Sequence, residues 1–241
     1  MNIFVTNDDG IASDGLLGLV EALRNSRKDD RIFVIAPDSN RSAISNAVSF
    51  FHEALKLKPY DENTWSCSGT PADCALMSIM GALGTKPDCL ISGINRGANL
   101  GTDLIYSGTA AAARQAALSG IPAVALSLAG HSPFVWRGAI DFSIEHFDDF
   151  LGYWKPDTFV NVNFPNLPDK PEKMLLTLPS RQYYNDELVV FDAPNNRRYC
   201  FVQSGTISSD PGEGTDAGAV GRGLVSVSSI YIHPVTGTML R

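Results

Sequence analysis

Residues 2–128 alternate between short apolar runs and segments with helical periodicity. The apolar runs have the length and composition of buried strands, and they lie at 2–6, 31–36, 88–92 and 122–128. Helices are predicted between them, from Leu16 to Leu23, from Pro71 to about Leu83, and from a cap at Ser107 or Thr109 to about Leu118. This alternation predicts an α/β fold, in which a doubly wound, mostly parallel sheet is covered by helices on both faces.

Shorter strand-like runs occupy the rest of the chain. Those at 47–51, 55–58 and 64–67 precede the second helix, and those at 174–178, 188–191, 199–202 and 225–232 are separated by Asp, Asn, Gly and Pro. We interpret the later runs as β-hairpins that pack on the core or reach another subunit. The chain has 241 residues, 44% of them hydrophobic, which suits one domain over 1–241, with a core at about 1–172 and a β-rich extension at about 173–241.

Composition excludes several classes of protein. A net charge of -7 argues against binding a nucleic-acid polymer, which needs a basic face. Met1 is followed directly by a strand, and the apolar run at 121–129 is too short to span a bilayer. We therefore expect a cytoplasmic protein without a membrane contact. The four cysteines lack CxxC spacing and are predicted to be reduced, buried thiols.

An acidic pair follows the first strand directly, in the segment Asn7-Asp8-Asp9-Gly10. Ligands of doubly wound sheets bind at the carboxyl ends of the strands, where this segment lies. Adjacent carboxylates repel each other unless a cation lies between them, and oxygen ligands favour Mg²⁺ or Mn²⁺. An acidic turn that caps the first helix is the alternative.

Ser39 and Asn40 follow the second strand. Parallel strands end at the same edge of a sheet, so the Ser39 hydroxyl is predicted to lie near Asp8 and Asp9 as a further oxygen ligand. Asn40 is predicted to contact the substrate. An Asp-Ser-Asn sequence is also ordinary turn chemistry.

A glycine-rich segment follows the third strand and leads into a helix. Gly93, Gly97 and Gly101 recur every four residues with Asn95 and Asn99 between them, which indicates a loop whose backbone approaches a ligand. Hydroxyls and N–H groups then meet at a helix N-terminus, where the helix dipole favours an anion, in Ser107-Gly108-Thr109. The segment matches neither GxGxxG nor GxxxxGK[ST]. A plain glycine-rich connection before a capped helix is the alternative.

Together these motifs resemble the SurE family of survival-protein nucleotidases. The resemblance also covers Gly69-Thr70-Pro71-Ala72-Asp73, Asn161-Val162-Asn163-Phe164-Pro165 and Thr215-Asp216. It implies a Rossmann-like core and hydrolysis of nucleoside 5'- and 3'-monophosphates, with short polyphosphate in some members. It also implies one divalent metal ion per subunit, and a homodimer or homotetramer joined through the C-terminal hairpins.

Several site residues follow from this resemblance. The metal ligands fall on Asp8, Asp9, Ser39 and Asn95, and the phosphate-contacting residues fall on Asn99, Ser107, Gly108 and Thr109. The chain departs from the family pattern at Ala110 and Gln115-Ala116, on the helix after Thr109. It departs again at Ser226-Val227-Ser228-Ser229-Ile230, which we assign to the oligomerisation region.

The predicted mechanism is metal-assisted hydrolysis of a phosphate monoester. The cation lowers the pKa of its bound water, while Asn99 and residues 107–109 hold the phosphate oxygens. Asp8 or Asp9 acts as the base for water, or one of them attacks directly; the sequence leaves both open.

Two other classes of protein also fit an acidic pair after the first strand. A receiver-like signalling module binds Mg²⁺ there, but it needs an aspartate where this chain has Ser92-Gly93-Ile94-Asn95, and it is about half as long. A nucleotide-binding protein without turnover would not need both carboxylates.

Overall fold

The computed structural model describes residues 1–209 and 212–234. Within these residues, nine strands form one central sheet in the order β3-β4-β2-β1-β5-β6-β7-β13-β8. Its strands are β1 Asn2–Thr6, β2 Arg31–Pro37, β3 Leu57–Asp61, β4 Thr64–Cys67, β5 Cys89–Arg96, β6 Ala123–Leu128, β7 Thr158–Phe164, β8 Met174–Leu176 and β13 Val225–Tyr231. Most neighbours are parallel, and only the pairs β3–β4 and β7–β13 are antiparallel. The predicted α/β fold with a mostly parallel sheet is confirmed.

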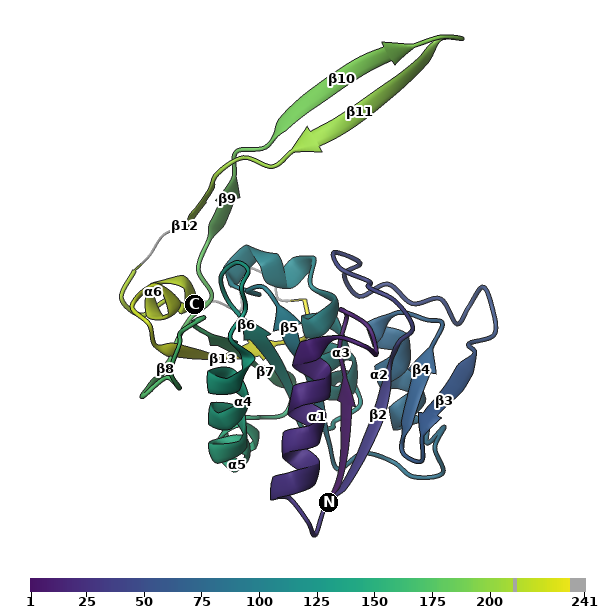
Figure 1. Ribbon diagram of the computed structural model, residues 1–241, viewed down its shortest axis with the longest axis vertical. Helices are drawn as coiled ribbons and strands as arrows, with labels where there is room; N and C mark the ends of the chain where they lie inside the picture. The colour runs from purple at the N-terminus through teal and green to yellow at the C-terminus, as the bar shows by residue number, and fades with distance from the viewer. Residues whose placement is uncertain (210–211, 235–241) are drawn as a thin grey trace.

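Helices cover both faces of the sheet (Figure 1). They are α1 Asp14–Ser26, α2 Pro71–Ile79, the 3-10 helix η1 Gly101–Ile105, α3 Gly108–Leu118, α4 Trp136–Glu145, α5 Phe147–Gly152 and α6 Asp216–Gly221. On one face, α1, α4 and α5 bury leucines and phenylalanines against the strands, and on the other face the alanines of α3 pack close to β5 and β6. β1 is buried from both sides, as a central parallel strand requires.

The ends of the helices follow from local chemistry. Thr70 caps α2 in a reciprocal capping box with Asp73, and Ser107 caps α3 by accepting a hydrogen bond from the Ala110 N–H. α2 ends at Ile79, before the predicted end near Leu83, because Gly81 adopts a positive φ of 81°.

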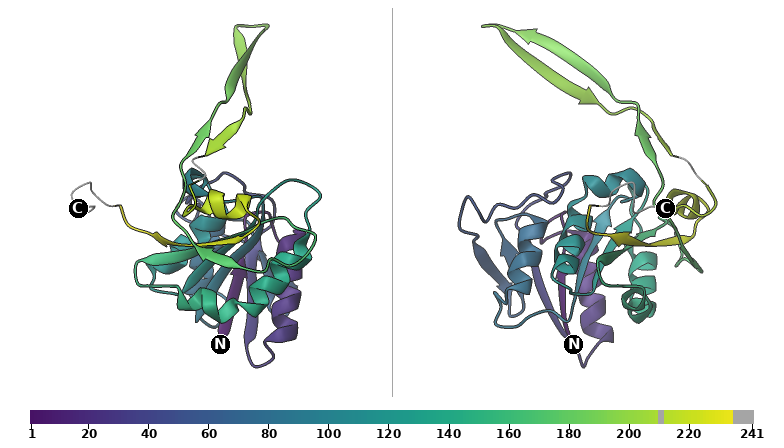
Figure 2. Two further views of the ribbon diagram at one scale, coloured as in Figure 1. Left: turned by 90° about the vertical axis from the view of Figure 1, so that its left-hand side faces the viewer. Right: turned by 180° about the vertical axis from the view of Figure 1, so that it is seen from behind.

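A long arm leaves the core after β8 and returns before α6 (Figures 1 and 2). It consists of β9 Gln182–Tyr184, β10 Glu187–Ala193, β11 Arg197–Gln203 and β12 Ile207–Ser209. β10 pairs with β11 as an antiparallel hairpin, and β9 pairs with β12 below it. The extension is predicted to begin at about residue 173, but β8 and β13 belong to the central sheet. The arm therefore begins later, after β8. The segment Ser226–Ile230, which is predicted to belong to the oligomerisation region, pairs with β7 inside that sheet.

Other differences from the predictions have local causes. The predicted strand at 47–51 is a loop, because Ser49 bonds to Asp73 at the start of α2 and not to a neighbouring strand. β5 runs on to Arg96, past the predicted end at Ser92, through an irregularity in its pairing with β6. Helices α4 and α5 and strand β7 were not predicted. Three cysteines are buried as predicted, whereas Cys200 on the arm is exposed.

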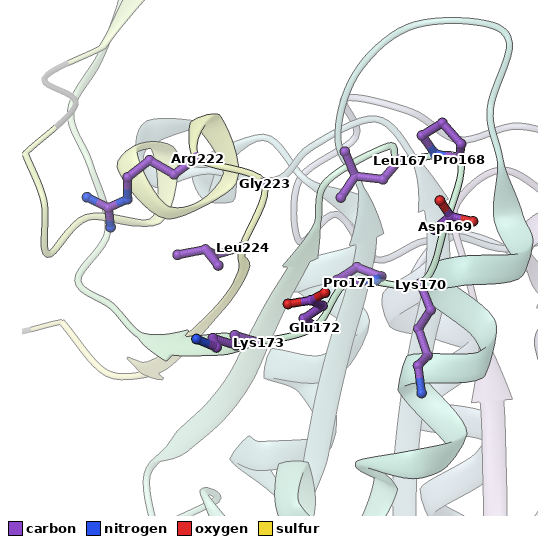
Figure 3. A pocket seen from close by; sticks show the side chains of 10 residues that line it. All are labelled: Leu167, Pro168, Asp169, Lys170, Pro171, Glu172, Lys173, Arg222, Gly223 and Leu224. Carbon is purple, nitrogen blue, oxygen red and sulfur yellow. The ribbon is translucent and has the colours of Figure 1, made fainter.

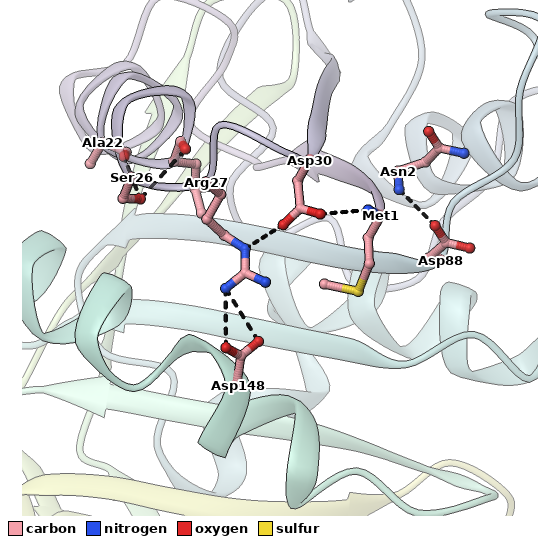
Figure 4. A network of polar contacts seen from close by, with 9 residues as sticks. Met1, Asn2, Ala22, Ser26, Arg27, Asp30, Asp88 and Asp148 are labelled. Atoms are coloured by element: carbon pink, nitrogen blue, oxygen red, sulfur yellow. Dashed lines mark hydrogen bonds and ion pairs between the residues drawn. The ribbon is translucent and has the colours of Figure 1, made fainter.

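A network of charged groups holds the N-terminus at the start of β1 (Figure 4), at the opposite end of this strand from Asp8 and Asp9. The Met1 amino group pairs with Asp30, and the Arg27 guanidinium joins Asp30 at 2.6 Å and Asp148 at 3.2 Å. Among the residues that the structure describes, no helix is long and apolar enough to cross a bilayer.

Candidate active site

Asp8 lies where β1 ends and contacts the first turn of α3. Its side chain is buried, and it accepts hydrogen bonds from the Thr109 hydroxyl at 2.7 Å and the Thr109 N–H at 3.2 Å. Gly108 permits this approach, because a Cβ at Gly108 would lie 2.9 Å from Asp8 Cβ and 3.1 Å from Pro71 Cγ. The acidic segment after β1 and the N-terminus of α3 therefore form one structural unit.

The two carboxylates sit where a negative charge is costly. Burial raises the pKa of Asp8 to about 6, opposed by the Thr109 hydrogen bond and increased by the charge of Asp9. Burial also raises the pKa of Asp9, although its Oδ2 accepts a hydrogen bond of 2.8 Å from the Arg96 N–H. A cation beside these oxygens would remove this cost, so the two side chains fit a divalent metal.

The loop after β2 packs against the acidic segment. A Cβ at Gly10 would lie 3.1 Å from the Ser39 carbonyl carbon, and Gly10 has a φ of 102° that favours glycine. The Ser39 hydroxyl donates to Asp38 at 3.0 Å, and the Asn40 side chain accepts from the Ser42 N–H at 2.8 Å. Ser39 and Asn40 are both exposed beside Asp9. Their side chains also form hydrogen bonds within the turn, as in the alternative interpretation of the Asp-Ser-Asn sequence.

Asn95 and Asn99 lie at the end of β5 and in the turn after it. The Asn95 amide donates to the Gly97 carbonyl at 3.0 Å, which leaves the side-chain oxygen of Asn95 available as a ligand. Asn99 is held firmly: its side chain donates to Ser127 at 2.7 Å, and its N–H donates to Asn163 at 2.8 Å. Asn161 and Asn163 both donate to the Asn99 carbonyl.

The predicted metal ligands line two neighbouring cavities. Asp8 and Asn95 line one of about 230 Å³, and Asp9 and Ser39 line another of about 280 Å³, with Arg96 in both walls. Asn99 and Ser107 share the first cavity, and Asn40 lies in the second. Thr109 lines neither, because both of its donors point to Asp8. Among the described residues, no cluster of three or more His, Cys, Asp or Glu could hold a metal, so any metal here depends on two carboxylates and neutral oxygens.

The residues that support these side chains are not among those predicted from the sequence. Arg96 fixes Asp9 through its backbone, and Asn161, Asn163 and Ser127 fix Asn99. The alternation of buried asparagines with apolar residues in 161–164 was a usable signal, because a buried amide side chain requires partners.

A further cavity of about 520 Å³ lies between residues 167–173 and 222–224 (Figure 3). Its charged side chains have both signs, among them Asp169, Lys173 and Arg222, and it contains none of the predicted site residues. It is separate from the site at the strand ends.

The fold and the site define a Rossmann-like α/β protein, with an acidic pair and a helix N-terminus at the carboxyl edge of a parallel sheet. The profile of the family described as Survival protein SurE matches residues 3–186. Similar proteins include the "5'-nucleotidase SurE" of Geobacter metallireducens, 37% identical over 96% of this chain and 92% of the relative, and that of Geobacter sulfurreducens, 39% identical over 96% and 88%. The crystal structure of the SurE protein from Aquifex aeolicus superposes with a TM-score of 0.84 at 31% identity, covering 100% of this chain and 96% of that one. The chain belongs to the SurE family.

Proposed function

We propose that this protein is a metal-dependent 5'-nucleotidase, which hydrolyses nucleoside monophosphates to a nucleoside and phosphate. The observation that carries the proposal is the contact of Asp8 with the first turn of α3, because it places an acidic pair beside an anion-favouring helix N-terminus. The relatives named 5'-nucleotidase, which align with almost the whole chain, support it.

The donor set suits a hard cation. Asp8, Asp9, Ser39 and Asn95 offer only oxygen ligands and would hold one Mg²⁺ or Mn²⁺ per subunit. When bound, this ion would neutralise phosphoryl charge and lower the pKa of a coordinated water.

The chain supplies hydrogen-bond donors for the phosphate oxygens. The Ser107 oxygen accepts from Ala110, so its hydroxyl hydrogen is free to donate to a phosphate. The Asn99 amide gives one hydrogen to Ser127 and keeps a second. The Gly108 N–H belongs to the same helix N-terminus, whereas the structure directs Thr109 to Asp8, so we assign Thr109 the further role of orienting that carboxylate.

Asp8 or Asp9 would take the proton of the attacking water, or attack the phosphorus itself. Rapid acid quenching followed by hydroxylamine distinguishes the two routes, because only direct attack forms an acyl phosphate that hydroxylamine can trap.

We also propose that the arm joins subunits into a dimer or tetramer. Its hairpin has large apolar side chains that are more than half exposed, including Leu188 at 65%, Phe191 at 57% and Phe201 at 56%. Soluble proteins rarely expose apolar surface of this extent unless another chain covers it.

Phosphate release from 5'-AMP, 3'-AMP and tripolyphosphate tests the proposed activity, with Mg²⁺, Mn²⁺ or a chelator present. We expect metal-dependent release from 5'-AMP, and we extend the proposal to 3'-AMP and short polyphosphate. An Asp9→Asn variant that kept the wild-type rate with saturating Mn²⁺ would refute the assignment of the acidic pair. Binding of AMP without phosphate release would identify a non-catalytic nucleotide-binding protein.

A further inference from the structure

One wall of the cavity that contains Asp8 has an aromatic side chain with no assigned role. Tyr106 follows η1 and directly precedes Ser107, and it lines the same cavity as Asp8, Asn99 and Ser107. Its side chain is 55% exposed. A tyrosine exposed to this extent beside a phosphate site is available to contact a ligand.

The backbone that carries Tyr106 is fixed on both sides. Its N–H donates to the Asp103 carbonyl at 3.0 Å, and its carbonyl accepts from the Ser45 N–H at 2.8 Å. The Ser45 hydroxyl also donates to the Ile105 carbonyl at 2.7 Å. The ring is therefore presented from a rigid support, which lowers the entropy lost when a ligand binds to it.

Asp103 and Tyr184 complete this part of the cavity. Asp103 lines the cavity and accepts a hydrogen bond from the Tyr184 hydroxyl, which comes from β9 at the root of the arm. The Gln182 N–H donates to the Thr102 hydroxyl at 3.0 Å, so the root of the arm is attached to η1 at two points. Tyr106 lines the same cavity as Asp103, and Asp103 bonds to Tyr184, so the three side chains form one cluster. Burial and the Asp103 carboxylate raise the pKa of Tyr184.

This cluster has the chemistry that a nucleoside requires. An aromatic ring stacks on any nucleobase, because every base has a π-face. A carboxylate accepts up to about four hydrogen bonds, so Asp103 has capacity for ribose hydroxyls beyond the one from Tyr184. Tyr106 and Ser107 are adjacent in the chain. In a nucleoside monophosphate one ribose separates the base from the phosphate, so the two residues suit contacts with the base and the phosphate of the same ligand.

We propose that Tyr106 and Asp103 form the nucleoside subsite of this enzyme: Tyr106 stacks on the base, Asp103 accepts hydrogen bonds from the ribose, and Tyr184 is a positioning residue that orients Asp103. This proposal rests on the proposed nucleotidase function. It makes the root of the arm part of the substrate site.

Kinetics with AMP and ribose 5-phosphate test the stacking, because the two substrates share phosphate and ribose and differ in the base. For Tyr106→Ala we expect the ratio of kcat/KM for AMP to that for ribose 5-phosphate to fall about tenfold or more, mainly through KM for AMP. Tyr106→Phe should keep the wild-type ratio. Tyr60→Ala is the matched control, since Tyr60 is 62% exposed and lines a different cavity.

An unchanged ratio in Tyr106→Ala would overturn the stacking role. If the wild-type protein released phosphate from neither substrate, the proposed function would fail independently. Calorimetry would then test the stacking role without turnover. The ratio of the affinity for AMP to that for ribose 5-phosphate should fall in Tyr106→Ala relative to the wild type.

Ribose 5-phosphate and glycerol phosphate test Asp103 and Tyr184. In Asp103→Asn and Tyr184→Phe we expect kcat/KM for ribose 5-phosphate to fall several-fold relative to that for glycerol phosphate, which lacks the ribose. A purely structural role would lower both values equally and would refute the assignment.

Discussion

The Asp8 carboxylate accepts a hydrogen bond of 2.7 Å from the hydroxyl of Thr109, which is 101 residues later in the chain. The contact joins the end of β1 to the first turn of α3. It also opposes the burial that raises the pKa of Asp8. Thr109 therefore influences how easily Asp8 becomes charged, which is the state in which it would bind the proposed cation.

Replacing Thr109 by valine should weaken metal binding at acidic pH. Loss of a hydrogen bond to a charged group costs about 1.5–3 kcal/mol, which raises the pKa of Asp8 by about one unit or more. The Mg²⁺ concentration for half-maximal activity should increase about tenfold at pH 6 and less at pH 8. Thr109→Ser keeps the hydroxyl and is the control. An equal effect at both pH values would contradict this explanation.

Asp8→Asn should stabilise the metal-free protein at neutral pH while it removes activity. The pKa of Asp8 is raised to about 6 in the folded state, so the folded state binds the proton more tightly than the unfolded chain does. The contribution of Asp8 to folding stability is then greatest below a pH of about 4, and it is lost as the pH rises through about 6. The variant avoids this loss, which amounts to at most about 3 kcal/mol.

Thermal unfolding with a chelator, at pH 4.5 and pH 7.5, measures this effect. The melting temperature of Asp8→Asn should exceed that of the wild type at pH 7.5 by several degrees, and the difference should shrink at pH 4.5. A variant that is less stable at pH 7.5 would show that the charge of Asp8 is not costly in the fold.

Gly108→Ala should reduce activity strongly. The new Cβ would meet Asp8 Oδ2 at 3.0 Å and Pro71 Cγ at 3.1 Å, so either the carboxylate or the start of α3 must shift. Small displacements of catalytic groups are costly, and we expect kcat/KM for AMP to fall about tenfold or more. Gly152→Ala is the control, because nothing lies within 4 Å of its added Cβ. Equal activities of the two variants would contradict the close contact.

Serine at both Leu188 and Phe201 should prevent the proposed assembly into a dimer or tetramer. These side chains are 65% and 56% exposed on the arm, so their loss leaves the core intact and removes apolar area that a partner would cover. Light scattering after gel filtration should give the mass of one chain, against two or four for the wild type. Met80→Ser is the control, since Met80 is 68% exposed outside the arm. A wild type with the mass of one chain would exclude the proposed assembly.

The local motifs could be found in the sequence because each depends on neighbouring residues. Pro71 and Ser107 mark helix starts, and Asp8, Ser39 and Asn95 follow apolar runs, so the rule that ligands bind at strand ends placed them at one edge. Helices α4 and α5 and the full length of β5 were missed. β5 passes through Gly93, whose backbone lies close to Leu126: an added Cβ would be 2.3 Å from the Leu126 carbonyl oxygen. Such a close approach of two backbones leaves no periodic pattern of apolar residues in the sequence.

The alternating α/β order, the acidic pair after the first strand and the capped helix at Ser107 can be recognised in the sequence, because strand length, periodicity and capping depend on a few neighbouring residues. The folded chain was needed to show that Thr109 donates to Asp8, that Asn161 and Asn163 hold Asn99, and that Tyr184 on the arm bonds to Asp103. These contacts join residues about 60 to 100 positions apart, and which buried polar groups become partners is fixed by the packing of the strands and helices between them.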